Sequence, residues 1–191
     1  MDGRPSRDDA WALLTEYTDN PSLIKHALAV EAAMRAYARR FGEDEAEWGA
    51  IGLIHDFDYQ QNPTVETHVH VGTAILRERD WPEDWVRTVA SHADYMGVPR
   101  DTLAAKTLFA VDELAGFLTA CALVRPDRSI AEVQATSVKK KLKDKAFARS
   151  VNREDIVRGA NELGVELAAH IEVVRDAMAT IADQLELPPR A

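Results

Sequence analysis

Apolar residues recur every three or four positions along almost the whole chain, and this spacing constrains the fold more than any other feature. Side chains three and four positions apart share one face of an α-helix, so the pattern predicts amphipathic helices. No segment shows the apolar–polar alternation that indicates a half-buried strand. A chain of 191 residues is long enough to bury a core of its own. We therefore expect an all-α fold and a single domain over residues 1–191.

Capping and turn residues divide this pattern into separate helices. Asn20-Pro21-Ser22 predicts a helix start, because Asn caps helices and Pro fits the first turn. Gly42 predicts the end of that helix. Polar residues and Pro63 interrupt the apolar spacing over residues 56–64. We expect helices over about residues 8–17, 21–41, 44–55, 65–79, 82–96, 102–123, 152–164 and 166–187, with short helices within 130–148.

The charge and cysteine content of the chain limit its partners. The formal net charge is −9, so no broad basic surface is available to neutralise the phosphates of a nucleic-acid polymer. No apolar run is long enough to span a bilayer, and no secretion signal is found at the amino terminus. Cys121 is the single cysteine, which indicates a reducing compartment. We expect a cytoplasmic protein without a membrane or nucleic-acid partner. The lysine-rich segment 139–145 is expected to be a solvated face, with phosphate binding as the alternative.

Three histidines lie on the apolar faces of expected helices. His26 comes three residues after Leu23 and four before Val30, and His55 and His92 occupy similar positions in their own helices. Residues at these spacings share a helix face, so the three imidazoles are expected to point inward. One inward histidine is more often a hydrogen-bonded core residue, but several such residues together favour a common site.

Asp112 raises a question of charge balance, because its neighbours on the helix face include Leu108 and Ala115. A carboxylate among aliphatic side chains is costly unless a metal ion, lysine or arginine meets it. Imidazole and carboxylate ligands together suit Zn²⁺, Mn²⁺ or Fe ions. Adjacent residues diverge by roughly 100° around a helix. The neighbouring pair His55-Asp56 can therefore contribute to one site only at a helix end.

In this order and helical context, these residues resemble the metal-binding pattern of the HD-domain superfamily of metal-dependent phosphohydrolases. That pattern is a histidine on one helix, a His-Asp pair on the next, and an aspartate on a later helix. The matching residues are His26 in LIKHALAVE, His55 and Asp56 in IGLIHDFDY, and Asp112 in LFAVDELAG. The resemblance covers about residues 20–120 and implies an HD-domain-like helical bundle, extended by further helices over residues 121–187.

Some branches of this superfamily carry two more histidines and bind two metal ions. One of these histidines stands in an H-x-x-x-G segment, which His68 and Gly72 match and which His70 does not. The other follows an apolar helix, as His92 does in TVASHADY. The resemblance thus implies one or two divalent transition-metal ions (Mn, Fe, Zn or similar), with the ligands His26, His55, Asp56, His68, His92 and Asp112.

The resemblance also implies a function: hydrolysis of a phosphate ester, such as a nucleotide or another small phosphorylated molecule. Asp56 would bridge two ions, Asp58 is a candidate general base, and Lys106 is a candidate phosphate contact. Two alternatives stay open at this point. A di-iron oxygenase of the same superfamily would use the same six ligands, and a non-catalytic domain would use the metal for structure or sensing. The substrate and the oligomeric state also stay open.

Overall fold

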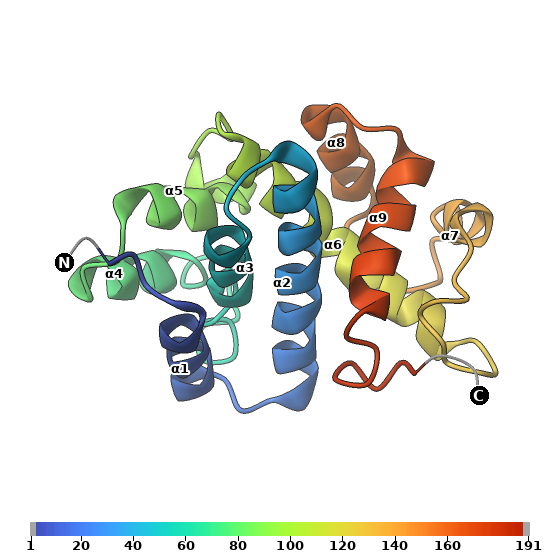
Figure 1. The fold of residues 1–191 in the computed structure, drawn as a ribbon, viewed down its shortest axis with the longest axis horizontal. Coiled ribbons are helices and arrows are strands. Elements are labelled where there is room, and N and C mark those ends of the chain that lie inside the picture. Colours follow the sequence, from blue (N-terminus) through green and yellow to red (C-terminus); the bar gives the residue numbers. More distant parts are fainter. Residues whose placement is uncertain (1–2, 189–191) are drawn as a thin grey trace.

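The computed structural model describes residues 3–188, and these residues form helices and turns without any strand (Figure 1). The predicted all-α class is therefore confirmed. The first two and last three residues of the predicted domain lie outside the described residues. The helices are α1 (Arg7–Tyr17), α2 (Pro21–Phe41), α3 (Glu45–Ile54), α4 (His70–Glu78), α5 (Glu83–Ser91), the 3₁₀ helix η1 (Asp94–Met96), α6 (Leu103–Leu123), α7 (Ala135–Lys141), α8 (Arg153–Leu163) and α9 (Leu167–Ala179).

Helix α2 begins and ends where its capping residues predict. The side chain of Asn20 accepts a hydrogen bond from the backbone N–H of Ser22, and Pro21 is the first helical residue. Gly42 follows the helix with a φ of 76°, the left-handed conformation that glycine adopts without steric cost. These local features explain why the bounds of this helix could be predicted from sequence.

The segment before α4 differs from the prediction. The helix begins at His70 rather than near Val65, because residues 65–69 form turns and Val69 has a φ of 62°. The buried carboxylate of Asp58 accepts hydrogen bonds from the backbone N–H groups of Val69 and Gly72, so a distant side chain satisfies the start of this helix. The predicted helix 82–96 likewise ends at Ser91 and is followed by η1.

Helix α9 is also shorter than predicted, since it ends at Ala179 and not near residue 187. Residues 181–186 form turns, and Glu186 has a φ of 55°. Ala182, Leu185 and Leu187 are nevertheless buried. The apolar spacing that predicted a longer helix therefore reflects real burial, but in a segment that turns.

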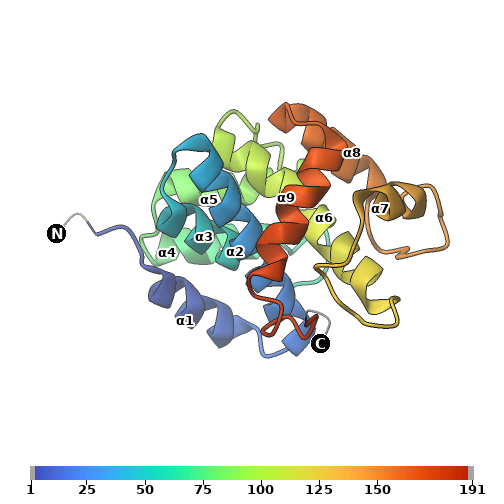
Figure 2. The ribbon, with the colours of Figure 1, turned by 45° about the vertical axis from the view of Figure 1, so that its right-hand side comes forward.

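Helix α2 lies in the middle of the molecule and contacts α3, α6 and α9 (Figure 1). Figures 1 and 2 both place α4 and α5 on one side of α2 and the helices α8 and α9 on the other. Gly52 permits the close approach of α3 to α2, because a Cβ atom there would lie 3.1 Å from the carbonyl oxygen of Val30. Helix α6 contacts elements of both sides, including α5 and α8.

His170 of α9 is fully buried and connects this helix to two others by hydrogen bonds. Its Nδ1 accepts from the hydroxyl of Tyr37 at 2.6 Å, and its Nε2 donates to the carbonyl oxygen of Ala110 at 2.9 Å. Burial lowers the pKa of His170, so the neutral imidazole is the stable form. Both His170 and the buried thiol of Cys121 are thus core residues. No helix within residues 3–188 is both long enough and apolar enough to cross a bilayer.

Candidate metal centre

The six predicted metal ligands come together although they lie on five separate parts of the chain. Their ligand atoms form two groups, each with all of its atoms within 4.8 Å of one another. The first group combines residues of α2, the end of α3 and α6, and the second combines the end of α3 with the residues before α4 and after α5. The groups are His26, His55, Asp56 and Asp112, and Asp56, His68 and His92.

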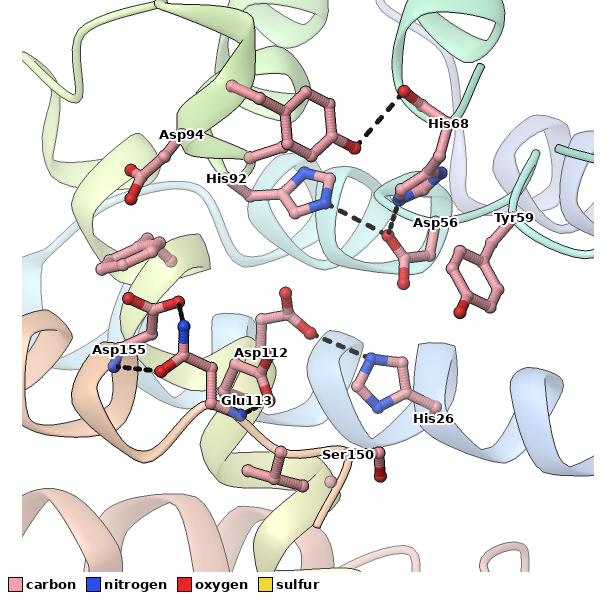
Figure 3. Close-up of a pocket in the computed structure, with 16 residues that line it drawn as sticks. His26, Asp56, Tyr59, His68, His92, Asp94, Asp112, Glu113, Ser150 and Asp155 are labelled. Carbon is pink, nitrogen blue, oxygen red and sulfur yellow. Dashed lines mark hydrogen bonds and ion pairs between the residues drawn. The ribbon is translucent and has the colours of Figure 1, made fainter. Parts of the chain in front are cut away.

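Asp56 belongs to both groups, and each of its carboxylate oxygens faces one of them (Figure 3). One oxygen, Oδ2, lies 3.5 Å from Nε2 of His55. The other, Oδ1, lies 3.1 Å from Nε2 of His68 and 3.2 Å from Nε2 of His92. The pair His55-Asp56 stands at the carboxyl end of α3, as predicted, where the chain leaves the helix and both side chains can point into the same space.

Asp112 completes the first group from α6. Its Oδ1 lies 3.0 Å from Nε2 of His26 and 3.4 Å from Nε2 of His55. Figure 3 shows His26 reaching this carboxylate from α2. Asp112, whose neighbours on the helix face are aliphatic, therefore lies next to two imidazoles.

Backbone carbonyls fix the orientation of two of the imidazoles. Nδ1 of His55 lies 2.7 Å from the carbonyl oxygen of Gly52, and Nδ1 of His92 lies 2.6 Å from that of Val89. A carbonyl oxygen only accepts, so Nδ1 must carry the proton in both residues. Nε2 then presents its lone pair to the cluster, which is the usual arrangement of a histidine that binds metal.

Asp58 holds the third imidazole, His68, from behind. Its Oδ1 lies 3.2 Å from Nδ1 of His68, while its Oδ2 accepts the N–H groups of Val69 and Gly72. A Cβ atom at position 72 would lie 2.7 Å from Oδ1 of Asp58, so glycine is needed there. Asp58 is 1% exposed. It does not line the cavity that opens beside the cluster, and a general base would have to act from within that cavity.

The donor atoms fit divalent cations. Nε2 of His55 and Oδ1 of Asp56 are fully buried, and they form no well-aligned hydrogen bond within the described residues. Buried polar atoms without such partners are uncommon because desolvation is costly. Three or four imidazole and carboxylate ligands match the preferences of Zn²⁺, Mn²⁺ and Fe ions. A cation bound at each group would give Nε2 of His55 and Oδ1 of Asp56 a partner.

The cluster is electrostatically prepared for a cation. Burial alone would raise the pKa of Asp56, but the imidazoles of His55, His68 and His92 outweigh burial and hold it well below its usual range. The pKa of Asp112 is lowered in the same way by its histidine partners. Burial opposes the charged form of His68, yet its two aspartate partners raise its pKa to about 9. These shifts favour positive charge beside the carboxylates, and a bound cation would supply that charge in exchange for protons of the imidazoles.

A cavity of about 510 Å³ opens beside the cluster, and His26, Asp56, His68, His92 and Asp112 line one side of it. Tyr59 and Tyr95 also line it: the ring of Tyr59 stands edge-on to His68, and the hydroxyl of Tyr95 donates to the carbonyl oxygen of His68. A second part of the lining, next to Asp112, consists of Phe109 and Glu113 of α6 and the residues Ser150, Val151, Asn152 and Asp155; we call it the α6–α8 wall.

Sequence reasoning missed this wall. Asn152 stands at the start of a predicted helix, and its side chain caps α8. Glu113 directly follows Asp112, which was the one signal available for it. Burial and the neighbouring Asp112 raise the pKa of Glu113 to about 7.

Several other candidates lie away from the cavity. Lys106 is half-buried on α6 and does not line the cavity, so its role as a phosphate contact has no geometric support. The lysine-rich segment 139–145 does not line it either. His70 is exposed, as expected for the histidine that does not match the pattern.

Comparison with known proteins gives one match. Residues 23–116 match the family model described as the HD domain, and this range contains all six clustered residues. No curated protein and no solved structure matches the chain significantly.

Proposed function

Because residues 23–116 place the chain in the HD-domain superfamily, we propose that it is a metal-dependent hydrolase of phosphate esters that uses two divalent ions. The observation that carries the proposal is the position of Asp56. One carboxylate oxygen faces His55 and the other faces His68 and His92, as a ligand shared by two ions would require. Ions at these groups, when bound, would supply hydroxide near neutral pH and neutralise charge on the phosphoryl oxygens.

The residues of the chain would hold this arrangement in place. The carbonyls of Gly52 and Val89 hold the rings of His55 and His92 so that Nε2 is directed at the cluster, where it would bind the metal. Asp58 does the same for His68, so we propose that Asp58 positions a ligand and does not act as the general base. The tyrosine-lined side and the wall of Glu113 leave space for a small substrate next to the cluster.

Metal content and turnover, measured together, test the proposal. We expect the wild-type protein to bind two equivalents of Mn²⁺ or Zn²⁺ and to hydrolyse members of a panel of phosphomonoesters. His92→Ala should lose the ion of the second group, and Asp112→Ala should lose the ion of the first. His70→Ala is a matched control, because this exposed histidine lies outside both groups.

The assay should be repeated without oxygen, since hydrolysis does not consume it and an oxygenase reaction does. Phosphate release that persists in a variant without bound metal would refute the proposal. Product formation that requires oxygen would favour the oxygenase alternative. The cytoplasmic location and the absence of a nucleic-acid partner stay predictions.

A further inference from the structure

Apart from the histidines of the ligand cluster, the cavity offers a substrate no basic side chain. None of the residues that line it is a lysine or an arginine. Three of its lining residues outside the cluster are carboxylates, namely Asp94, Glu113 and Asp155. A substrate with several phosphates normally meets arginine or lysine side chains in addition to metal. This lining therefore disfavours polyphosphates.

The arginines behind this wall are already engaged. Arg100 pairs with Glu162 at 2.7 Å and with Asp94 at 2.8 Å, and its guanidinium lies 3.8 Å from the ring centre of Phe109. Arg158 pairs with Asp94 and Asp155, and it also lies over the ring of Phe109.

Acidic groups outnumber guanidiniums in and behind this wall. Asp94, Asp155 and Glu162 pair with the two arginines, and Glu113 is a fourth acidic group outside these pairs. Such an excess beside a cavity favours a cationic group on whatever binds there.

Glu113 is the carboxylate of this wall that lacks a cationic partner. Its Oε2 accepts the backbone N–H of Asn152 at 3.1 Å, and the described residues provide no ion pair for it. Arg153, which directly follows Asn152, donates instead to the backbone carbonyls of residues 144, 147 and 148. Glu113 follows Asp112 on α6, so the same cavity connects it with the ligand cluster.

Resting on the proposed function, we infer that the substrate is a phosphate monoester whose alcohol part carries an ammonium group. The phosphate would lie toward the ligand cluster, and the ammonium group would lie between Glu113 and Asp155. The cavity volume of about 510 Å³ suits a small ligand of this kind. Glu113 is then a specificity-determining residue, and the hydrolytic step itself needs no ammonium group.

Two phosphonates test this inference by binding alone, because a C–P bond resists phosphoester hydrolysis. 3-Aminopropylphosphonate carries the ammonium group, and propylphosphonate lacks it. Titration calorimetry on the Zn²⁺-loaded protein should show at least about tenfold tighter binding of the amine, since a hydrogen bond between charged groups contributes about 1.5–3 kcal/mol. Inorganic phosphate is titrated in parallel and tests the proposed function.

Variants test whether Glu113 in this wall causes the preference for the phosphonate that carries the ammonium group. Glu113→Gln keeps the shape of the side chain and removes its charge, so the affinity ratio of the two phosphonates should fall at least about threefold. This ratio is taken within one variant and is unaffected by the folded fraction. Glu154→Gln is the matched control, because Glu154 is exposed on α8 and does not line the cavity, and it should keep the wild-type ratio.

Three outcomes would overturn the inference. Equal affinities of the two phosphonates would refute it, and the proposed function would stand if inorganic phosphate still bound. An unchanged ratio in Glu113→Gln would refute the role of Glu113. Failure of the metal-loaded protein to bind any of the three anions would overturn the inference and the proposed function together.

Discussion

Asp58 shows how much one residue can contribute without contacting substrate. Its two oxygens face Nδ1 of His68 and the N–H groups of Val69 and Gly72, so every contact is to a donor. Asparagine cannot reproduce this pattern, because its NH₂ group would face either the imidazole or the backbone donors. Asp58→Asn should weaken the ion held by His68 and His92 roughly 10- to 100-fold and leave the other ion in place.

Metal titration followed by elemental analysis measures this loss. A general defect in folding would reduce both ions equally, whereas a positioning role predicts the selective loss of one. Asp101→Asn serves as the control, since Asp101 is exposed and does not line the cavity. Equal affinity for both ions in Asp58→Asn would contradict the assignment.

At the scale of helices, the contact between α6 and α8 depends on a glycine. A Cβ atom at Gly159 would lie 2.6 Å from Cα of Ala110, so alanine there must push the two helices apart. We expect Gly159→Ala to lower the free energy of unfolding by about 1–3 kcal/mol in urea titrations. Because α8 carries part of the cavity wall, binding of 3-aminopropylphosphonate should weaken as well.

Gly116→Ala gives the opposite expectation in the same helix pair. A Cβ atom there meets nothing within 4 Å, so the substitution should stabilise α6 by up to about 1 kcal/mol through helix propensity. Destabilisation by both substitutions would show that close packing at Gly159 is not the cause.

The buried imidazole of His170, which joins α9 to α2 and α6, predicts that the free energy of unfolding depends on pH. Burial lowers the pKa of His170 below its usual value of 6.5, so the unfolded chain binds more protons than the folded one just below that pH. The contribution of His170 to stability should therefore fall as the pH drops from about 7 toward 5. His170→Gln keeps a donor and an acceptor but does not titrate, so the difference in free energy of unfolding between wild type and variant should shrink over this pH range in chelator-treated samples.

The helices that carry the ligand cluster were predictable from local patterns, whereas the full set of six ligands was implied by the resemblance to the HD-domain superfamily. The spacing of His26 and Asp112 within apolar helices, and the helix end after His55, follow from residues close in sequence. The start of α4 depends instead on Asp58, eleven residues before Val69. The wall near Asp155 depends on how α8 packs against α6, a contact that no local pattern specifies.

For the molecule as a whole, we propose that the chain is a single cooperative domain, because one core cluster includes side chains from Ala10 of α1 to Met178 of α9. All four tryptophans lie at positions 11, 48, 81 and 85, in the first half of the chain. Tryptophan fluorescence thus reports on that half, while circular dichroism at 222 nm reports on every helix. The two thermal unfolding curves should coincide if the domain unfolds as one unit. A C-terminal extension over residues 121–187 that unfolds separately would add a circular dichroism transition without a matching change in fluorescence, and the proposal of a single domain would then be wrong.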